Sequence, residues 1–157
     1  MKETVQKYYG NRLRVRACGW LVQDGAVLLA NHVGITNHSF WAPPGGGIEF
    51  GESAHDCLKR EWLEETGLKV EVRDFLFACE LIGNDLHAVE LFFAVTQTGG
   101  HLQLGSDPEV GAPTVLTGLQ FFNQKQLTAA EKKQLHGIFR LSANPHEILG
   151  FRGYFKL

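Results

Sequence analysis

Apolar stretches along the chain, some alternating with polar residues and some continuous, predict a series of β-strands. Residues 14–22 begin with arginines that alternate with apolar residues and then become wholly apolar, and residues 26–30 are apolar again. Asp24-Gly25 lies between these stretches and is typical of a tight turn, so we expect them to pair as a hairpin. Stretches rich in Val, Leu and Phe predict three further strands, at residues 70–79, 86–96 and 115–122.

Two segments between these strands lack a regular pattern. Residues 31–39 are mostly polar and contain a glycine, which predicts a loop. Phe40-Trp41 then leads into the run Pro43-Pro44-Gly45-Gly46-Gly47. Because proline lacks a backbone N–H and glycine adopts many backbone conformations, this run predicts irregular backbone.

The clearest helix is predicted at residues 54–66. Ser53 followed by Asp56 resembles a capping box at the start of this helix, and Gly67 stands where the helix would end. Its position between pairs of strands indicates that it packs on a sheet.

A second capping box, Thr128 with Glu131, predicts another helix near the end of the chain. This helix would be amphipathic and would run through Leu135, Ile138 and Phe139. Strands mixed with two capped helices indicate a fold that combines α and β structure.

Length and composition are those of a globular protein. The 157 residues are about the length of one domain, and no repeat or linker-like stretch divides them, so we expect a single domain over residues 1–157. Hydrophobic residues make up 44% and charged residues 20%, which argues against disorder, collagen and coiled coil.

Charge and cysteine content exclude several classes of partner. A formal net charge of -2 provides no broad basic field for nucleic acid or an anionic membrane, so we expect neither partner. No apolar run approaches the roughly 18 residues of a membrane-spanning helix. The three cysteines are widely spaced without a C-x-x-C pair, which favours neither disulfides nor zinc and fits a reducing cytoplasm.

The predicted helix at residues 54–66 carries an unusual set of carboxylates. On a helical wheel, one arc holds the residues expected to face the sheet, Ala54, Cys57, Leu58 and Trp62, whereas Asp56, Lys59 and Arg60 point elsewhere. Glu61, Glu64 and Glu65 fall within this arc or at its edge.

Such a cluster of carboxylates requires a compensating charge. Desolvating one unpaired carboxylate costs on the order of several kcal/mol, so a divalent cation is a natural compensator. Oxygen ligands without a His or Cys cluster favour Mg²⁺ or Mn²⁺ over zinc. A solvated helix edge explains the glutamates equally well from the helix alone. The preceding glycine run favours the metal, because it lets backbone approach a ligand closely.

The same segment resembles the Nudix box, G-x5-E-x7-R-E-U-x-E-E-x-G-U, in which U is a bulky apolar residue. Every fixed position is filled, by Gly46, Glu52, Arg60, Glu61, Trp62, Glu64, Glu65, Gly67 and Leu68. Trp62 is a mild departure, since that position more often holds an aliphatic residue. The flanking segments also resemble the Nudix hydrolase family, so the similarity extends from about Val15 to Phe139.

The resemblance implies an α/β/α sandwich with a mixed, partly parallel sheet. It also implies Mg²⁺-dependent hydrolysis of a diphosphate linkage in a nucleoside diphosphate derivative, such as a nucleoside triphosphate or a nucleotide sugar, through attack of an activated water at phosphorus. Carried over to this chain, the metal ligands would be Glu61, Glu64, Glu65 and the Gly46 carbonyl, with Glu52 and Arg60 supporting the site. The alternative is a nucleotide-binding or regulatory module of the same fold, but such modules are expected to lack box glutamates.

The general base and the substrate contacts are less specified by the sequence. In the family, the base is a box glutamate or a glutamate from a later loop, here Glu109, with Glu90 as the next candidate; an ordinary surface carboxylate explains either equally well. The candidate substrate-binding residues are Arg14, Arg16, Phe40, Trp41, Gly45 and Glu90. Packing in the core or a solvated strand face are the competing explanations for the aromatic and basic residues.

The sequence specifies neither one substrate nor one oligomeric state. In subfamilies that act on ADP-ribose or dinucleoside polyphosphates, a Pro or Tyr often follows the box, and residues 68–96 contain neither, which weakly disfavours both substrates. Enzymes of this family and size are often homodimers. The apolar tail either contributes to such an interface or packs on its own domain; it includes Ile148, Leu149, Phe151, Tyr154 and Phe155.

Overall fold

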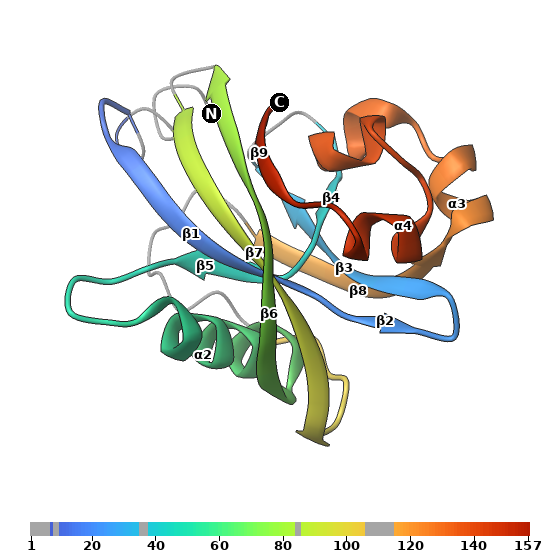
Figure 1. The fold of residues 1–157 in the computed structure, drawn as a ribbon, viewed down its shortest axis with the longest axis horizontal. Helices are drawn as coiled ribbons and strands as arrows, with labels where there is room; N and C mark the ends of the chain where they lie inside the picture. The colour runs from blue at the N-terminus through green and yellow to red at the C-terminus, as the bar shows by residue number, and fades with distance from the viewer. Residues whose placement is uncertain (1–6, 8–9, 35–37, 84–85, 106–114) are drawn as a thin grey trace.

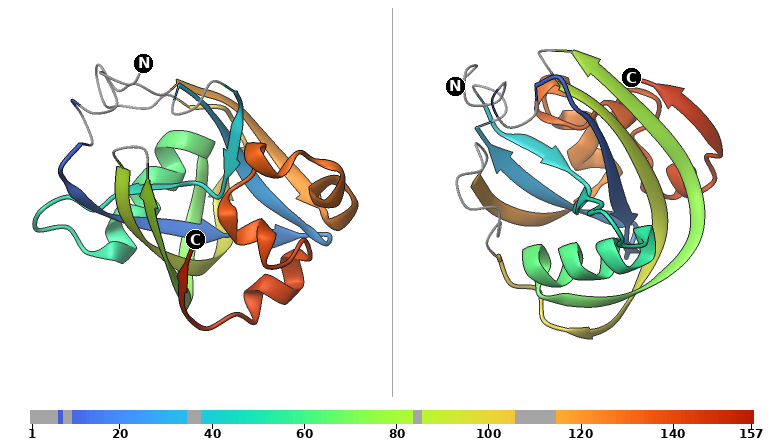
Figure 2. Two further views of the ribbon diagram at one scale, coloured as in Figure 1. Left: turned by 90° about the horizontal axis from the view of Figure 1, so that it is seen from above. Right: turned by 90° about the vertical axis from the view of Figure 1, so that its left-hand side faces the viewer.

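The computed structural model describes residue 7 and residues 10–34, 38–83, 86–105 and 115–157. Two β-sheets form the centre of the molecule, with helix α2 on one side of the strands and helices α3 and α4 on the other (Figures 1 and 2). This arrangement confirms the predicted α/β class.

The larger sheet has five strands in the order β5-β1-β7-β6-β9. β1 is parallel to β7 and β6 is parallel to β9, whereas the β1–β5 and β6–β7 pairs are antiparallel. The sheet is therefore mixed and partly parallel, as expected. Its strands are β1 (Leu13–Trp20), β5 (Gly45–Gly47), β6 (Leu68–Gly83), β7 (Leu86–Gly100) and β9 (Gly153–Lys156).

The smaller sheet is built around a central strand, β3. β3 pairs antiparallel with β2 and β4, and also with β8. Its strands are β2 (Val22–Gln23), β3 (Ala26–Val33), β4 (Phe40–Ala42) and β8 (Val115–Asn123). β3 therefore extends into the segment predicted as a loop at residues 31–39.

The predicted hairpin is correct at its turn but wrong in its first strand. Asp24 and Gly25 both have positive φ, 51° and 76°, as a two-residue hairpin turn with right-handed twist requires. This turn joins β3 to the short β2, however, and not to β1. β1 crosses to the larger sheet instead, where it pairs with β7 over its whole length.

The glycine run is a strand and not irregular backbone. Gly45–Gly47 forms β5 and pairs with β1. A Cβ added to Gly45 would lie 2.2 Å from the Ala17 carbonyl oxygen, so only glycine permits this close approach of the two strands.

Helix α2 (Ala54–Thr66) has the predicted bounds and caps. The Ser53 hydroxyl accepts a hydrogen bond from the Asp56 N–H at 3.0 Å, and Gly67 ends the helix with φ of 73°. Cys57, Leu58 and Trp62 are fully buried, as the wheel predicted, and pack with apolar residues of both sheets.

The C-terminal helices begin at a different residue from the predicted one. Asn123, not Thr128, caps α3 (Gln124–Ala129), because its side chain accepts from the Gln126 N–H while the Gln126 side chain accepts from the Asn123 N–H. The predicted helix from Thr128 is wrong, since Ala130 is already extended. Short helices follow: the 3-10 helices η1 (Lys132–Gln134) and η2 (Gly137–Arg140), then α4 (Pro145–Leu149).

The end of the chain packs on its own domain. Ile148 is fully buried, and the rings of Phe151 and Phe155 lie 6.3 and 5.8 Å from the ring of Phe77. Tyr154 is exposed. None of the described helices is long and apolar enough to span a membrane.

Candidate functional site

Strand β5 and helix α2 bring residues of the Nudix-box motif together. Gly46 faces the side chain of Glu61, and a Cβ added to Gly46 would lie 2.2 Å from the Glu61 carboxylate carbon. The glycine is therefore required for the Glu61 carboxylate to lie against the strand backbone. This contact places the Glu61 carboxylate directly against the glycine strand.

We expect Gly46→Ala to lower kcat/KM about 100-fold, because the added methyl group must displace Glu61 by more than 1 Å. The matched control is Gly47→Ala, whose Cβ would meet only Arg14 Nη2 at 3.8 Å. Its effect on kcat/KM is expected to stay within about twofold. Steady-state kinetics of the two variants measure the difference, and equal losses would contradict this role of Gly46.

Arg60 binds three carboxylates of the site at once. Its Nε and Nη2 donate to the two Glu52 oxygens at 2.7 and 3.0 Å, which is a bidentate pair. Its Nη1 donates to Glu61 at 2.8 Å and to Glu64 at 3.4 Å. The wheel prediction that Arg60 points away from the glutamates is wrong, because the long side chain turns back along the helix surface. The support implied by the family resemblance agrees with this geometry.

The pKa values of two glutamates at the site are shifted in opposite directions. Hydrogen bonds from Arg60 lower the pKa of Glu52 to about 2, from an ordinary value of 4.5. Burial raises the pKa of Glu61 to about 7, although Arg60 acts in the opposite direction. Burial therefore disfavours the ionised form of Glu61, and a nearby cation would favour it.

The Glu52 shift predicts a pH dependence of stability. A carboxylate whose pKa is lowered by folding stabilises the folded state above its unfolded pKa, and this contribution is lost as the pH falls through the folded pKa. The wild-type protein should therefore have a higher Tm than Glu52→Gln above pH 4.5, with the difference disappearing toward pH 2. Thermal unfolding of both proteins across this pH range tests the prediction, and a difference that does not change with pH would refute it.

Glu90 lies in a second, buried network. Only 2% of the residue is exposed, and its two carboxylate oxygens contact Arg16 Nη1 and His136 Nε2, the latter at 2.6 Å. The Cys18 thiol also lies 3.5 Å from Glu90. Burial alone would raise the pKa of Glu90, but His136 and Arg16 lower it overall. Glu90 is therefore an ionised partner of Arg16 in this structure.

Arg16 connects this network to the box. Its Nη2 lies 3.4 Å from the Gly45 carbonyl oxygen. Burial acts to lower the pKa of Arg16, but Cys18, Glu90, Glu65 and Glu61 raise it overall. Glu65 is 5% exposed. The guanidinium therefore joins the Glu90 side chain to the glycine strand.

The other sequence candidates lie in different surroundings. Both aromatic residues are partly buried: the Trp41 ring packs on Phe122 at 5.0 Å, against the core, and the Phe40 ring lies 6.3 Å from the His136 ring. Arg14 is half-buried on β1, near Gly47. Glu109 lies outside the described residues.

Charge at the site remains negative after the arginines are counted. Glu52, Glu61, Glu64, Glu65 and Glu90 are five carboxylates, and Arg16 and Arg60 are two cations, which leaves three uncompensated charges when all are ionised. Within the described ranges, no three His, Cys, Asp or Glu side chains are grouped closely enough to hold a metal ion, and Arg60 binds Glu61 and Glu64 instead. The carboxylate oxygens beside Gly46 are hard donors in excess of the nearby cations. They fit a divalent cation, which would displace the Arg60 contacts with Glu61 and Glu64.

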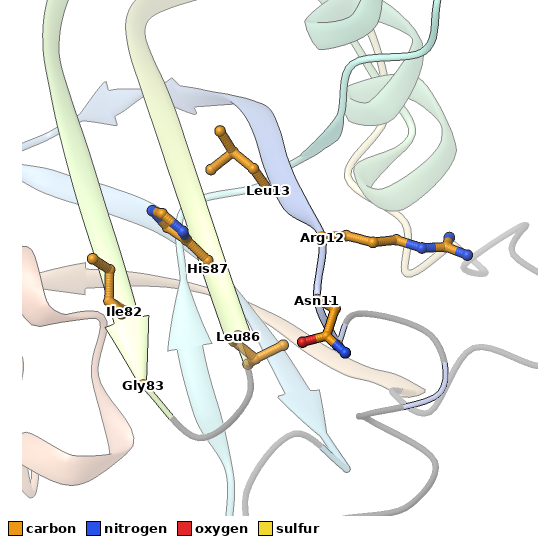
Figure 3. Close-up of a pocket in the computed structure, with 8 residues that line it drawn as sticks. Asn11, Arg12, Leu13, Ile82, Gly83, Leu86 and His87 are labelled. Carbon is orange, nitrogen blue, oxygen red and sulfur yellow. The ribbon is translucent and has the colours of Figure 1, made fainter.

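A cavity of about 420 Å³ lies at the beginning of β1, next to the end of β6 and the start of β7 (Figure 3). The pairing of β1 with β7 places Leu13 opposite His87 at this cavity and Arg16 opposite Glu90 further along the same strands. The sequence did not indicate this cavity. Its lining is Gly10, Asn11, Arg12, Leu13, Ile82, Gly83, Leu86 and His87.

His136 is a further residue of this network that no local pattern in the sequence indicated. His136 is only 2% exposed, and it contacts Glu90, which lies 46 positions earlier in the chain. No local spacing could indicate such a pair. The alternation of Arg14 and Arg16 was a local signal, but it could not identify Glu90 as the partner.

Comparison with protein families gives one domain match that includes this whole site. Residues 11–140 match the family model described as NUDIX domain. An ADP-ribose pyrophosphatase of Methanocaldococcus jannaschii is 31% identical over 91 residues, which are 57% of this chain and 54% of that protein. An RNA pyrophosphohydrolase of Erythrobacter litoralis is 33% identical over 67 residues, 41% of each chain. The chain thus spans about half the length of these curated relatives.

Solved structures show the same fold. A MutT NUDIX hydrolase from Burkholderia pseudomallei has a TM-score of 0.68 at 22% identity, covering 85% of this chain and 97% of that chain. A UDP-X diphosphatase has a TM-score of 0.64 at 22% identity, covering 99% of this chain and 72% of that chain.

Proposed function

Because the chain belongs to the NUDIX domain family, we propose that it hydrolyses a diphosphate linkage in a nucleoside diphosphate derivative, with Mg²⁺ as the metal and Mn²⁺ as a substitute. The observation that carries this proposal is the contact between Gly46 and Glu61, which unites the glycine strand and the acidic helix at one place. The family generally uses a divalent metal, and the choice of Mg²⁺ rests on the hard oxygen donors of the site.

The residues proposed to hold the metal are Glu61, Glu64, Glu65 and the Gly46 carbonyl. When bound, a divalent cation neutralises phosphate charge and lowers the pKa of a water molecule, which makes this water a nucleophile at neutral pH. The bidentate Glu52–Arg60 pair keeps Arg60 beside these glutamates. The Arg16 guanidinium supplies positive charge to the diphosphate from the β1 side.

Removal of a proton from the attacking water requires a carboxylate that is free to accept it. Glu64 is the most exposed of the box glutamates that Arg60 binds, with 32% of its side chain accessible and a 3.4 Å contact. Glu64 and Glu109 are therefore the candidates for the base. Glu90 is not, because both of its oxygens are engaged by Arg16 and His136.

The proposed substrate is a small molecule that contains a nucleoside diphosphate. The relatives are named for ADP-ribose and RNA pyrophosphate bonds, and one solved structure is named for UDP-X, so these names define a class and not one substrate. A net charge of -2 argues against extended contacts with nucleic acid. The described cysteines are free and buried, which fits a reducing compartment such as the cytoplasm.

A substrate panel tests this function. The purified protein is incubated with nucleoside triphosphates, ADP-ribose and UDP-glucose, with Mg²⁺, with Mn²⁺ or with a chelator, and the products are separated by chromatography. We expect metal-dependent release of a nucleoside monophosphate from at least one compound. Binding without any product would instead support the non-catalytic nucleotide-binding module and overturn the proposal.

A further inference from the structure

A chain of buried hydrogen bonds connects helix η2 to strand β1. His136, which precedes η2, donates from Nε2 to Glu90 on β7 at 2.6 Å. Glu90 in turn accepts from Arg16 Nη1. His136 and Glu90 are each only 2% exposed, so water contributes little to this network.

The second ring nitrogen of His136 defines its protonation state. Nδ1 accepts a hydrogen bond from the backbone N–H of Ile138 at 3.1 Å. A nitrogen that accepts cannot carry a proton, so the proton lies on Nε2 and points at Glu90. His136 is therefore neutral, and the Glu90 charge is paired with Arg16.

The contact with Glu90 uses only part of the hydrogen-bonding capacity of the Arg16 guanidinium. Nη1 is occupied by Glu90, whereas Nε has no hydrogen-bond partner among the described residues and Nη2 has only the 3.4 Å contact with the Gly45 carbonyl. A buried N–H without an acceptor is unfavourable, and the Nε–Nη2 edge matches two oxygens of a phosphate. The guanidinium contacts Gly45 of the glycine strand, and the next residue of that strand, Gly46, lies against the Glu61 carboxylate.

We propose that His136 is a positioning residue, which holds Glu90 and thereby orients the Nε–Nη2 edge of Arg16 toward the diphosphate of the substrate. This inference rests on the proposed function, because it assigns Arg16 to the diphosphate of that substrate. His136 itself does not contact the substrate. Its effect is on substrate binding, since Arg16 holds the diphosphate before and during the reaction.

Two substitutions separate this role from a purely structural one. In His136→Asn, Oδ1 occupies the place of Nδ1 and still accepts from Ile138, but no donor reaches Glu90. In His136→Gln, Nε2 still reaches Glu90, but the acceptor for Ile138 is lost. A cap for η2 is therefore preserved only by Asn, whereas the link to Arg16 is preserved only by Gln. The control is His146→Asn, at an exposed position of α4.

The probe is methylenediphosphonate, a diphosphate analogue that is not hydrolysed, titrated calorimetrically in the presence of excess Mg²⁺. His136→Asn removes a hydrogen bond to a charged group, so it should raise the Kd at least about tenfold. His136→Gln should remain within about threefold of the unmodified protein. For a hydrolysed compound, His136→Asn should raise KM with little change in kcat.

Nitrogen NMR provides a readout that is independent of catalysis. The ¹⁵N shifts of His136 should show the proton on Nε2, and the signal of Arg16 Nε–H should shift when methylenediphosphonate is added. A proton on Nδ1, an unshifted Arg16 signal, or unchanged Kd in His136→Asn would each overturn the inference. So would a larger loss of affinity in His136→Gln than in His136→Asn, which indicates capping alone. The substrate panel tests hydrolysis independently of these binding measurements. Failure of the His136 proposal would therefore not contradict the proposed hydrolysis, and absence of hydrolysis would not affect the binding test.

Discussion

Replacing Glu65 by Gln is expected to lower kcat/KM by about 1000-fold or more for any compound that the protein hydrolyses. Glu65 is 5% exposed and belongs to the proposed metal-binding set, and Gln preserves its volume while removing its charge. Loss of a metal ligand removes several kcal/mol of transition-state stabilisation, and each 1.4 kcal/mol corresponds to a factor of ten. Steady-state kinetics with Mg²⁺ measure this loss.

The matched control for this substitution is Glu131→Gln. Glu131 is an exposed carboxylate whose salt bridge with Lys133 contributes little, so its loss should leave kcat/KM within about twofold. Comparable activity of Glu65→Gln and Glu131→Gln would show that Glu65 is an ordinary carboxylate of the helix.

Replacing Trp62 by Ala should lower the free energy of unfolding by about 3–5 kcal/mol. Trp62 is a fully buried residue of α2. Its indole N–H donates to the Pro44 carbonyl at 2.9 Å, and this hydrogen bond connects the helix to the segment before β5. The substitution therefore leaves a cavity and removes one of two hydrogen bonds to the Pro44 carbonyl, which still accepts from the Gly19 N–H at 3.0 Å. Urea unfolding monitored by circular dichroism gives the free energy.

The neighbouring Leu63 provides the control for Trp62. Leu63 is 49% exposed on the same helix, so Leu63→Ala should cost less than about 1 kcal/mol. A cost for Trp62→Ala no larger than that for Leu63→Ala would show that the indole does not anchor the helix.

Helix α2 could be predicted to the residue because the signals that define it are local. Ser53, Asp56 and Gly67 act within one turn of the helix ends, and the structure shows each in its expected place. The same kind of signal failed at Thr128, because Asn123 with Gln126 forms a complete capping box five residues earlier. Two capping sequences competed for the same segment, and the sequence alone could not rank them.

Strand pairing was less predictable because it depends on contacts far apart in the chain. The Asp24-Gly25 turn was identified correctly, but β1 pairs with β7, more than 70 residues away. Likewise, β5 forms only because the absence of side chains on Gly45 lets it approach β1. Glycines that suggest irregular backbone in isolation are here required by a neighbouring strand.

The candidate site likewise has one part that local sequence patterns predict and another part that depends on contacts between distant residues. The spacing of the box is enough to propose Glu61, Glu64 and Glu65 as metal ligands, because all three lie on the single helix α2. The network of Arg16, Glu90 and His136 joins three separate elements, and only the fold reveals it. The family resemblance implied that Arg60 supports the site, but only the fold shows that it binds three carboxylates.

The most direct test of the proposed metal site is an electron paramagnetic resonance titration of Mn²⁺, which measures the free ion in the presence of protein. We predict that the wild-type protein binds Mn²⁺, that Mg²⁺ competes with it, and that Glu65→Gln loses this binding while Glu131→Gln retains it. Equal binding of Mn²⁺ by the wild-type protein and Glu65→Gln, or no binding by either, would contradict the assignment of the box glutamates as metal ligands.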